Sequence, residues 1–175
     1  MSSILKVDTI QNTGGTTGLA IDSSGRVTRP VIPAWRVGLT SSLVFSGVTQ
    51  NELTTIQWTS SSDSARDRFI QGGCSLSSGK ITVPVTGLYQ MSSTVRFDNV
   101  GSGYALLQIY KNDDTDSTYG SYSIDGTPDT NYLSISTDIL LNLNANETVR
   151  TTFKLNLDTS FQLNSRSYFQ GYLIG

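Results

Sequence analysis

Residues 79–91 read Gly-Lys-Ile-Thr-Val-Pro-Val-Thr-Gly-Leu-Tyr-Gln-Met, and this stretch decides the fold class. Apolar side chains stand at every second position, which is the period of a strand with one buried face. They are Ile81, Val83 and Val85 before a corner, and Tyr89 and Met91 after it. Pro84 has no N–H to donate to a sheet, and Gly87 reaches backbone angles that are closed to other residues. The stretch therefore predicts a strand, a tight corner and a second, longer strand.

The same alternation returns along the rest of the chain. In residues 132–143 the apolar side chains of one face are Leu133, Ile135, Ile139, Leu141 and Leu143. No segment shows sustained helical spacing with capping residues. Residues 40–51 and 111–129 are polar and are expected to be loops. We therefore expect an all-β protein, a two-sheet antiparallel sandwich of about eight to ten strands.

Three segments carry a family resemblance. Residues 82–89 resemble the T-x-P-V-x-G-x-Y part of the motif F-T-x-P-V-x-G-x-Y, and residues 169–173 resemble a terminal F-x-G-x-L. Residues 109–113 resemble I-Y-K-N-G, with Asp113 in place of the glycine. These motifs are found in the globular head of complement component one q, a domain related to the tumour-necrosis-factor jelly roll. The resemblance covers residues 33–175. It implies a jelly-roll head that usually forms trimers and contacts its partners through loops.

Residues 1–29 differ from the rest of the chain. Residues 3–10 read as a short strand with apolar side chains on both faces, and residues 19–27 as a hairpin around an Asp-Ser-Ser-Gly turn. The segment resembles N-terminal or shaft elements of bacteriophage fibre proteins. A lone strand with two apolar faces needs partners, so we expect this extended β arm to attach to other copies or to a larger body. The expected contact residues are Ile4, Leu5, Val7, Ile10, Leu19, Ile21 and Val27.

Two prolines, Pro30 and Pro33, favour a stiff and extended connector after the arm. We therefore expect two parts, an attachment or trimerisation arm over residues 1–29 and a jelly-roll head over residues 30–175.

The composition argues against several classes of function. The 175 residues carry a net charge of -2, which favours neither nucleic acid nor an anionic membrane as a partner. The chain has no histidine and a single cysteine, Cys74, so histidine-based catalytic sites and zinc sites are excluded. Asp63 and Asp67 are a carboxylate pair, but Arg66 and Arg68 beside them indicate local ion pairs. We expect no enzymatic activity.

Residues 111–129 hold one Lys and five Asp, which makes this segment the most acidic of the chain. Asp113, Asp114 and Asp116 are weak candidates for calcium, which prefers carboxylate oxygens, and some heads of the resembled family bind calcium. No other cofactor is expected. The candidate ligand-binding residues of this loop are Asp114, Asp116, Tyr119 and Tyr122, whose side chains suit a glycan or a protein.

A trimer interface is expected on the strand at residues 104–111. Ala105, Leu107 and Ile109 form one face of this strand. Tyr104, Leu106 and Tyr110 face the other way, and we expect them to contact neighbouring copies, because aromatic side chains supply large contact areas.

Together these features predict a bacteriophage virion structural protein. The expected form is a homotrimeric capsid decoration, or cement, knob whose arm attaches to the major capsid protein or another virion protein and stabilises the shell. The alternative is a short tail fibre or spike whose head binds a host surface glycan or protein receptor. A secreted binding module is a further class, but the N-terminus shows no secretory signal. We expect assembly in the host cytoplasm and a place on the virion surface, without membrane insertion.

Overall fold

The computed structural model describes residues 7–11, 13–14, 17–28, 32–46, 52–59, 67–100, 103–113, 118–127, 130–156 and 160–174. Every regular element among these residues is a β-strand. The chain divides into two compact units, Met1–Ile32 and Pro33–Gly175, which we call the arm unit and the head.

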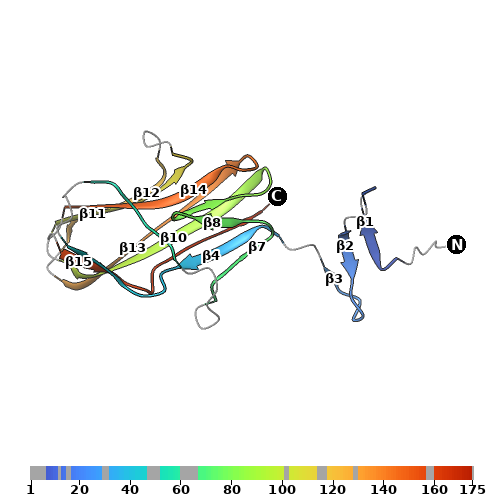
Figure 1. The fold of residues 1–175 in the computed structure, drawn as a ribbon, viewed down its shortest axis with the longest axis horizontal. Helices are drawn as coiled ribbons and strands as arrows, with labels where there is room; N and C mark the ends of the chain where they lie inside the picture. Colours follow the sequence, from blue (N-terminus) through green and yellow to red (C-terminus); the bar gives the residue numbers. More distant parts are fainter. Residues whose placement is uncertain are drawn as a thin grey trace. The chain divides into compact units, whose positions relative to one another are not determined.

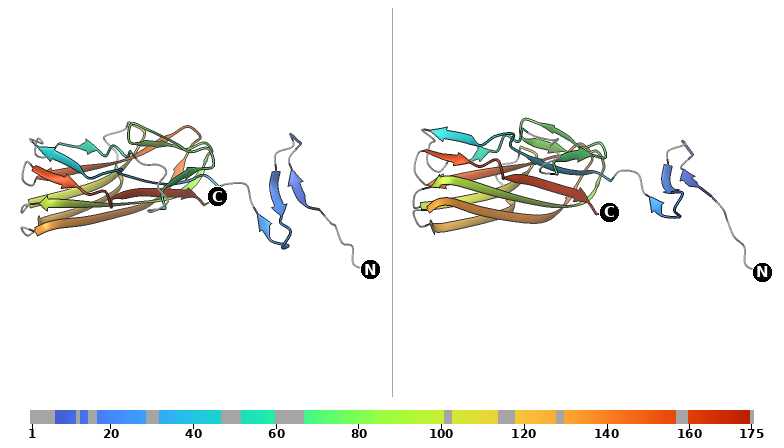
Figure 2. Two further views of the ribbon diagram at one scale, coloured as in Figure 1. Left: turned by 60° about the horizontal axis from the view of Figure 1, so that its bottom comes forward. Right: turned by 90° about the horizontal axis from the view of Figure 1, so that it is seen from below.

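The head consists of two antiparallel sheets that face each other across one core (Figures 1 and 2). Sheet I has 7 strands, with the order β5-β15-β10-β16-β4-β7 and with β13 paired to β10. Its strands are β4 (Ala34–Gly38), β5 (Leu43–Ser46), β7 (Phe69–Gln71), β10 (Gly87–Val100), β13 (Thr130–Leu143), β15 (Ser160–Leu163) and β16 (Tyr168–Leu173).

Sheet II has 6 strands, with the order β12-β11-β14-β9-β8 and with β6 paired to β14. Its strands are β6 (Thr54–Thr55), β8 (Ser75–Ser77), β9 (Lys80–Thr82), β11 (Gly103–Lys111), β12 (Thr118–Thr127) and β14 (Thr148–Asn156). The chain crosses repeatedly between the sheets, and its last strand, β16, lies between β10 and β4. The expected all-β, two-sheet antiparallel sandwich is confirmed, with 7 and 6 strands in its sheets where the sequence predicted about eight to ten in all.

Residues 79–91 form the predicted strand, corner and long strand. Gly79, with a φ of 74°, occupies the two-residue turn between β8 and β9, where glycine is favoured. Strand β9 ends at Thr82, two residues before Pro84, and β10 begins at Gly87. One expectation fails: Val85 is 41% exposed because the corner has already turned it away from the core.

Two of the expected loops contain strands. Residues 43–46 form β5, which pairs with β15, and residues 118–127 form β12, which pairs with β11. Both expectations relied on polar composition. Strand β12 reads TYGSYSIDGT, and its small and polar residues hide the alternation that identifies a strand. Its backbone is paired all the same, because β11 offers a free row of N–H and C=O groups.

Aromatic side chains fill the middle of the sandwich. The ring of Phe153 on sheet II lies edge-on to Phe45, Phe97 and Phe161 of sheet I, with centroids 5.5 to 5.7 Å apart. Such edge-on pairs add to the free energy gained from burial alone. These contacts join the two sheets and fix the distance between them.

A buried arginine ties the connections at one end of sheet I together. Arg68 is 6% exposed, and its guanidinium donates to the backbone carbonyls of Leu39 at 2.8 Å and Ser165 at 2.7 Å. These carbonyls follow β4 and β15, respectively. The guanidinium of Arg68 fits against Gly38 because this residue has no side chain. A Cβ at position 38 would overlap the guanidinium.

Gly171 makes close packing around Trp35 feasible, so Gly171→Ala is expected to destabilise the head. A Cβ at this position would lie 2.6 Å from Cη2 of Trp35 and 2.9 Å from Cγ of Met91. Overpacking of this kind costs about 1–3 kcal/mol, and a domain of this size loses about 2–4 °C in Tm per kcal/mol. Thermal unfolding followed by tryptophan fluorescence measures the change.

Gly18→Ala is the matched control, since the Cβ would meet its nearest neighbour, the carbonyl oxygen of Ile10, at 3.5 Å. An unchanged Tm for Gly171→Ala would contradict the packing account.

Candidate functional site

The arm unit is a small sheet of three strands, β1 (Thr9–Gln11), β2 (Thr17–Ile21) and β3 (Val27–Thr28). The predicted Asp-Ser-Ser-Gly hairpin joins β2 to β3. The carboxylate of Asp22 accepts the backbone N–H groups of Ser24 and Arg26, both at 2.9 Å, and pairs with the Arg26 guanidinium at 2.7 Å. The hydrogen bonds from Arg26 lower the pKa of Asp22. The turn is therefore held by its own side chains.

The predicted attachment residues gather on one apolar surface of the arm unit. Five of them, together with Asp8 and Thr9, line a hollow of 80 Å³. The five are Val7, Ile10, Leu19, Ile21 and Val27. Val27 is 65% exposed and Ile10 is 54% exposed. Three short strands bury too little area to cover these side chains. Ile4 and Leu5 lie outside the described residues.

The residues predicted for a trimer interface on β11 are less accessible than expected. Tyr104 and Leu106 are half-buried, and Tyr110 is only 3% exposed. The ring of Tyr110 has the Arg150 guanidinium 5.6 Å from its centroid, and its hydroxyl donates to Gln108 at 3.3 Å. Tyr110 therefore offers almost no surface to a second copy.

Several exposed apolar side chains of the head lie instead on the outward face of sheet I. Tyr132 and Leu140 of β13 are 61% and 53% exposed, and Tyr172 of β16 is 52% exposed. Register places Leu140 and Tyr172 on either side of Gln90. The sequence analysis did not single these residues out. The signal was present in residues 132–143, whose second face carries Tyr132 and Leu140 at even positions.

The acidic segment is only partly described, and its first carboxylate is already engaged. Asp113 pairs with Lys80, and with Arg150 at 3.1 Å, and the hydrogen bond from Lys80 lowers its pKa. Among the described residues, no three metal-ligating side chains come together. Asp114 and Asp116 lie outside the described residues. Tyr119 and Tyr122 lie on β12 rather than in a loop, and their side chains are not described.

Two adjoining hollows open on the outward face of sheet I, next to β4. One measures 230 Å³ and is lined mainly by β4, β7, β10 and β16, and the other measures 280 Å³ and includes three arginines. Arg36 and Asp67 line both. Asp67 is exposed, and Asp63, the other member of the carboxylate pair, lies outside the described residues.

Comparison of the sequence with known protein families and with curated proteins finds no match. None of the described residues belongs to a helix that could cross a membrane.

The single cysteine is expected to be unreactive in the folded protein. Cys74 is buried, and this burial raises the pKa of its thiol to about 11. Because the thiolate is the reactive form, roughly one thiol in a thousand is ionised at pH 8. We expect slow labelling by a chromogenic disulfide reagent at this pH, and rapid, stoichiometric labelling in denaturant. Rapid labelling of the folded chain would contradict this assignment, and Cys74→Ser sets the background.

Proposed function

We propose that this protein is a bacteriophage virion surface protein, a homotrimeric knob that decorates the capsid and stabilises it through its arm. The observation that carries the proposal is the apolar surface of the arm unit, defined by Val7, Ile10, Leu19, Ile21 and Val27. The virion assignment also rests on the resemblance of residues 1–29 to phage fibre segments.

The arm unit gains free energy by being covered. Burying a Val, Leu or Ile side chain contributes roughly 1.5–3 kcal/mol relative to leaving it exposed. Val27 and Ile10 are more than half exposed, so burying both against a complementary surface of a shell protein would stabilise the complex. Three arms on one knob would bind together, because attachment of the first raises the effective concentration of the other two.

Self-association of the head is supported by its longest edge. Strand β13 has 14 residues and pairs, among the described strands, with β10 on one side alone. A long open edge is a surface that soluble proteins normally cover or interrupt. Tyr132 and Leu140 lie on this strand and face outward. We therefore assign the trimer contact to β13 rather than to Tyr110.

The second candidate function is a short tail fibre or spike whose head binds a host surface glycan or protein. The observation in its favour is the pair of hollows that meet at Arg36, since concave sites with a few polar groups are typical of ligand binding. Copy number separates the candidates. Hundreds of copies on the shell support decoration, and a few copies at the tail support a fibre.

Val27→Asp is expected to abolish attachment to shells while the head stays folded. The substitution places a charge on the apolar surface at a residue that is 65% exposed, so folding of the arm unit is little affected. Co-sedimentation with shells that lack the protein measures attachment, and thermal rupture of the shells measures stabilisation.

Ser23→Asp is the control for this experiment, because it adds the same charge at an exposed turn residue away from the hollow. Equal rupture temperatures with and without bound protein would overturn the decoration role. Full attachment of Val27→Asp would overturn the role of the apolar surface.

Leu140→Asp is expected to convert the trimer to monomer, as measured by native mass spectrometry. Leu140 is 53% exposed in the single chain, so its loss affects association more than folding. Asn156→Asp adds the same charge to an exposed residue of β14 on sheet II and is expected to remain trimeric. A monomeric wild-type chain, or a trimeric Leu140→Asp variant, would contradict the assignment.

A further inference from the structure

The two adjoining hollows on sheet I share Arg36 and Asp67 in their linings, and together we call them the arginine groove. Its β-sheet floor is set by register: Ser92, Gln170, Arg36 and Phe69 stand opposite one another on four neighbouring strands. Side chains on such a row all point to the same side of the sheet. Residues distant in the sequence therefore meet at one site.

Arg36 is held in place at the centre of the groove. Its Nη1 donates to Oε1 of Gln170 at 3.1 Å, and Nε2 of Gln170 donates to Oγ of Ser92 at 3.0 Å. The guanidinium also lies over the ring of Tyr168, 4.4 Å from its centroid. A guanidinium has five N–H donors, and a single hydrogen bond of Arg36 is recorded within the described residues. Within the described residues, its other guanidinium N–H groups have no hydrogen-bond partner.

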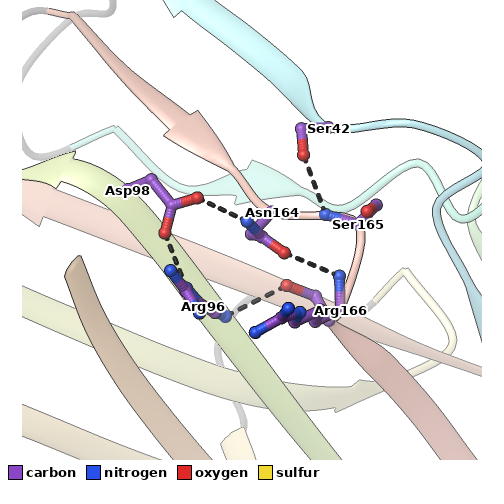
Figure 3. A network of polar contacts seen from close by, with 7 residues as sticks. Ser42, Arg96, Asp98, Asn164, Ser165 and Arg166 are labelled. Atoms are coloured by element: carbon purple, nitrogen blue, oxygen red, sulfur yellow. Dashed lines mark hydrogen bonds and ion pairs between the residues drawn. The ribbon is translucent and has the colours of Figure 1, made fainter.

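A second arginine stands at the other end of the groove on a braced turn (Figure 3). Backbone N–H groups of Ser165 and Arg166 donate to Ser42 Oγ at 3.1 Å and to Asn164 Oδ1 at 2.9 Å. The Asn164 amide in turn donates to Asp98, which also pairs with Arg96. The Arg166 side chain is exposed, and its guanidinium has no recorded partner within the described residues.

The second hollow of the groove carries positive charge, although the net charge of the whole chain is negative. The charged residues that line the second hollow are Arg36, Arg68, Arg166 and Asp67, three positive and one negative, which gives +2 in a chain of net charge -2. Arg68 donates to two backbone carbonyls, which leaves Arg36 and Arg166 as the arginines of this hollow that could contact an anion. Arginine pairs with carboxylate, sulfate or phosphate through two parallel hydrogen bonds.

The other hollow supplies flat apolar surface. Tyr172 and Phe69 line it and are 52% and 40% exposed, while Gln90 and Asp67 add polar groups at its rim. The C–H face of a sugar ring packs on aromatic rings of this kind, while its hydroxyls bond to amide and carboxylate groups. Each hollow is smaller than the roughly 300–1,000 Å³ that encloses a drug-sized ligand, which suits one sugar unit per hollow.

From this arrangement we infer that the arginine groove binds an acidic saccharide, with Arg36 and Arg166 on its anionic group and with Tyr172 and Phe69 under a sugar ring. The inference deepens the second candidate function and rests on it for the source of the saccharide. Every residue involved belongs to the head, so the binding itself is independent of the arm.

The test is calorimetric titration of the full chain with four probes. Trigalacturonate carries carboxylates, a sulfated galacto-oligosaccharide carries sulfates, maltotriose is neutral, and inorganic phosphate is an anion without a sugar. We expect saturable binding of one or both acidic oligosaccharides, and the stronger of the two identifies the anion. No saturable binding of either, or equal binding of maltotriose or of phosphate alone, would overturn the inference.

Variants locate the site. Arg166→Gln and Arg36→Gln should each raise the Kd about tenfold or more, since each removes a charge-assisted hydrogen bond. The Kd of Arg36→Lys should lie between that of Arg36→Gln and that of the wild type, because lysine keeps the charge but lacks the planar guanidinium. Tyr172→Ala should weaken binding as well, whereas Tyr104→Ala on sheet II should not.

The control for charge is Lys154→Gln, which removes one positive charge from β14 on sheet II. An equal effect of Lys154→Gln and Arg166→Gln would show non-specific attraction and overturn the inference. Native mass spectrometry and shell attachment are measured on the same samples. A trimer that attaches to shells and ignores acidic sugars refutes this inference alone, and a sugar-binding chain found only on the shell refutes the tail-fibre role.

Discussion

The alternation along β10 is the constraint on which the rest of the head depends. Tyr89, Met91, Ser93, Val95 and Phe97 are all fully buried, and the residues between them face outward. A shift by one residue would move this whole set to the solvent face. Because β13, β15 and β16 all pair with β10, the same register determines which of their side chains reach the core. The same register therefore also determines which side chains of sheet I face outward.

Much of the head follows from its sequence, because strands with one buried face show their period directly. The alternation in residues 79–91 and 132–143 predicted the strands that these residues form. It also predicted which side chains point inward, with the exception of Val85. Strand β12 was missed for a physical reason: its stability comes from backbone pairing with β11, and backbone hydrogen bonds leave little trace in composition. Polar and glycine-containing strands at the border of a sheet are the hardest to predict from one sequence.

The surface features were predicted less completely than the strands. The apolar arm residues are close in sequence, and the described ones do line a common hollow, because a hairpin brings neighbours in the chain together. Alternation assigned Tyr110 correctly to the face opposite Ile109, but it does not tell whether Arg150 covers that face. The arginine groove draws on Arg36, Phe69, Arg166 and Tyr172, which meet only once the register of four strands is set.

The two units differ in how they dispose of apolar surface, and this difference bears on function. The head encloses its core side chains between two sheets, while its outward rows carry polar and charged residues beside exposed side chains such as Leu140 and Tyr172. The arm unit has a self-contained turn at Asp22, but within its described residues no second layer covers the apolar side chains, and Ile10, Ile21 and Val27 stay exposed. An apolar surface of this kind is stabilised when another surface covers it. This is why we propose attachment as the role of the arm, and keep recognition as a proposal for the outward face of the head.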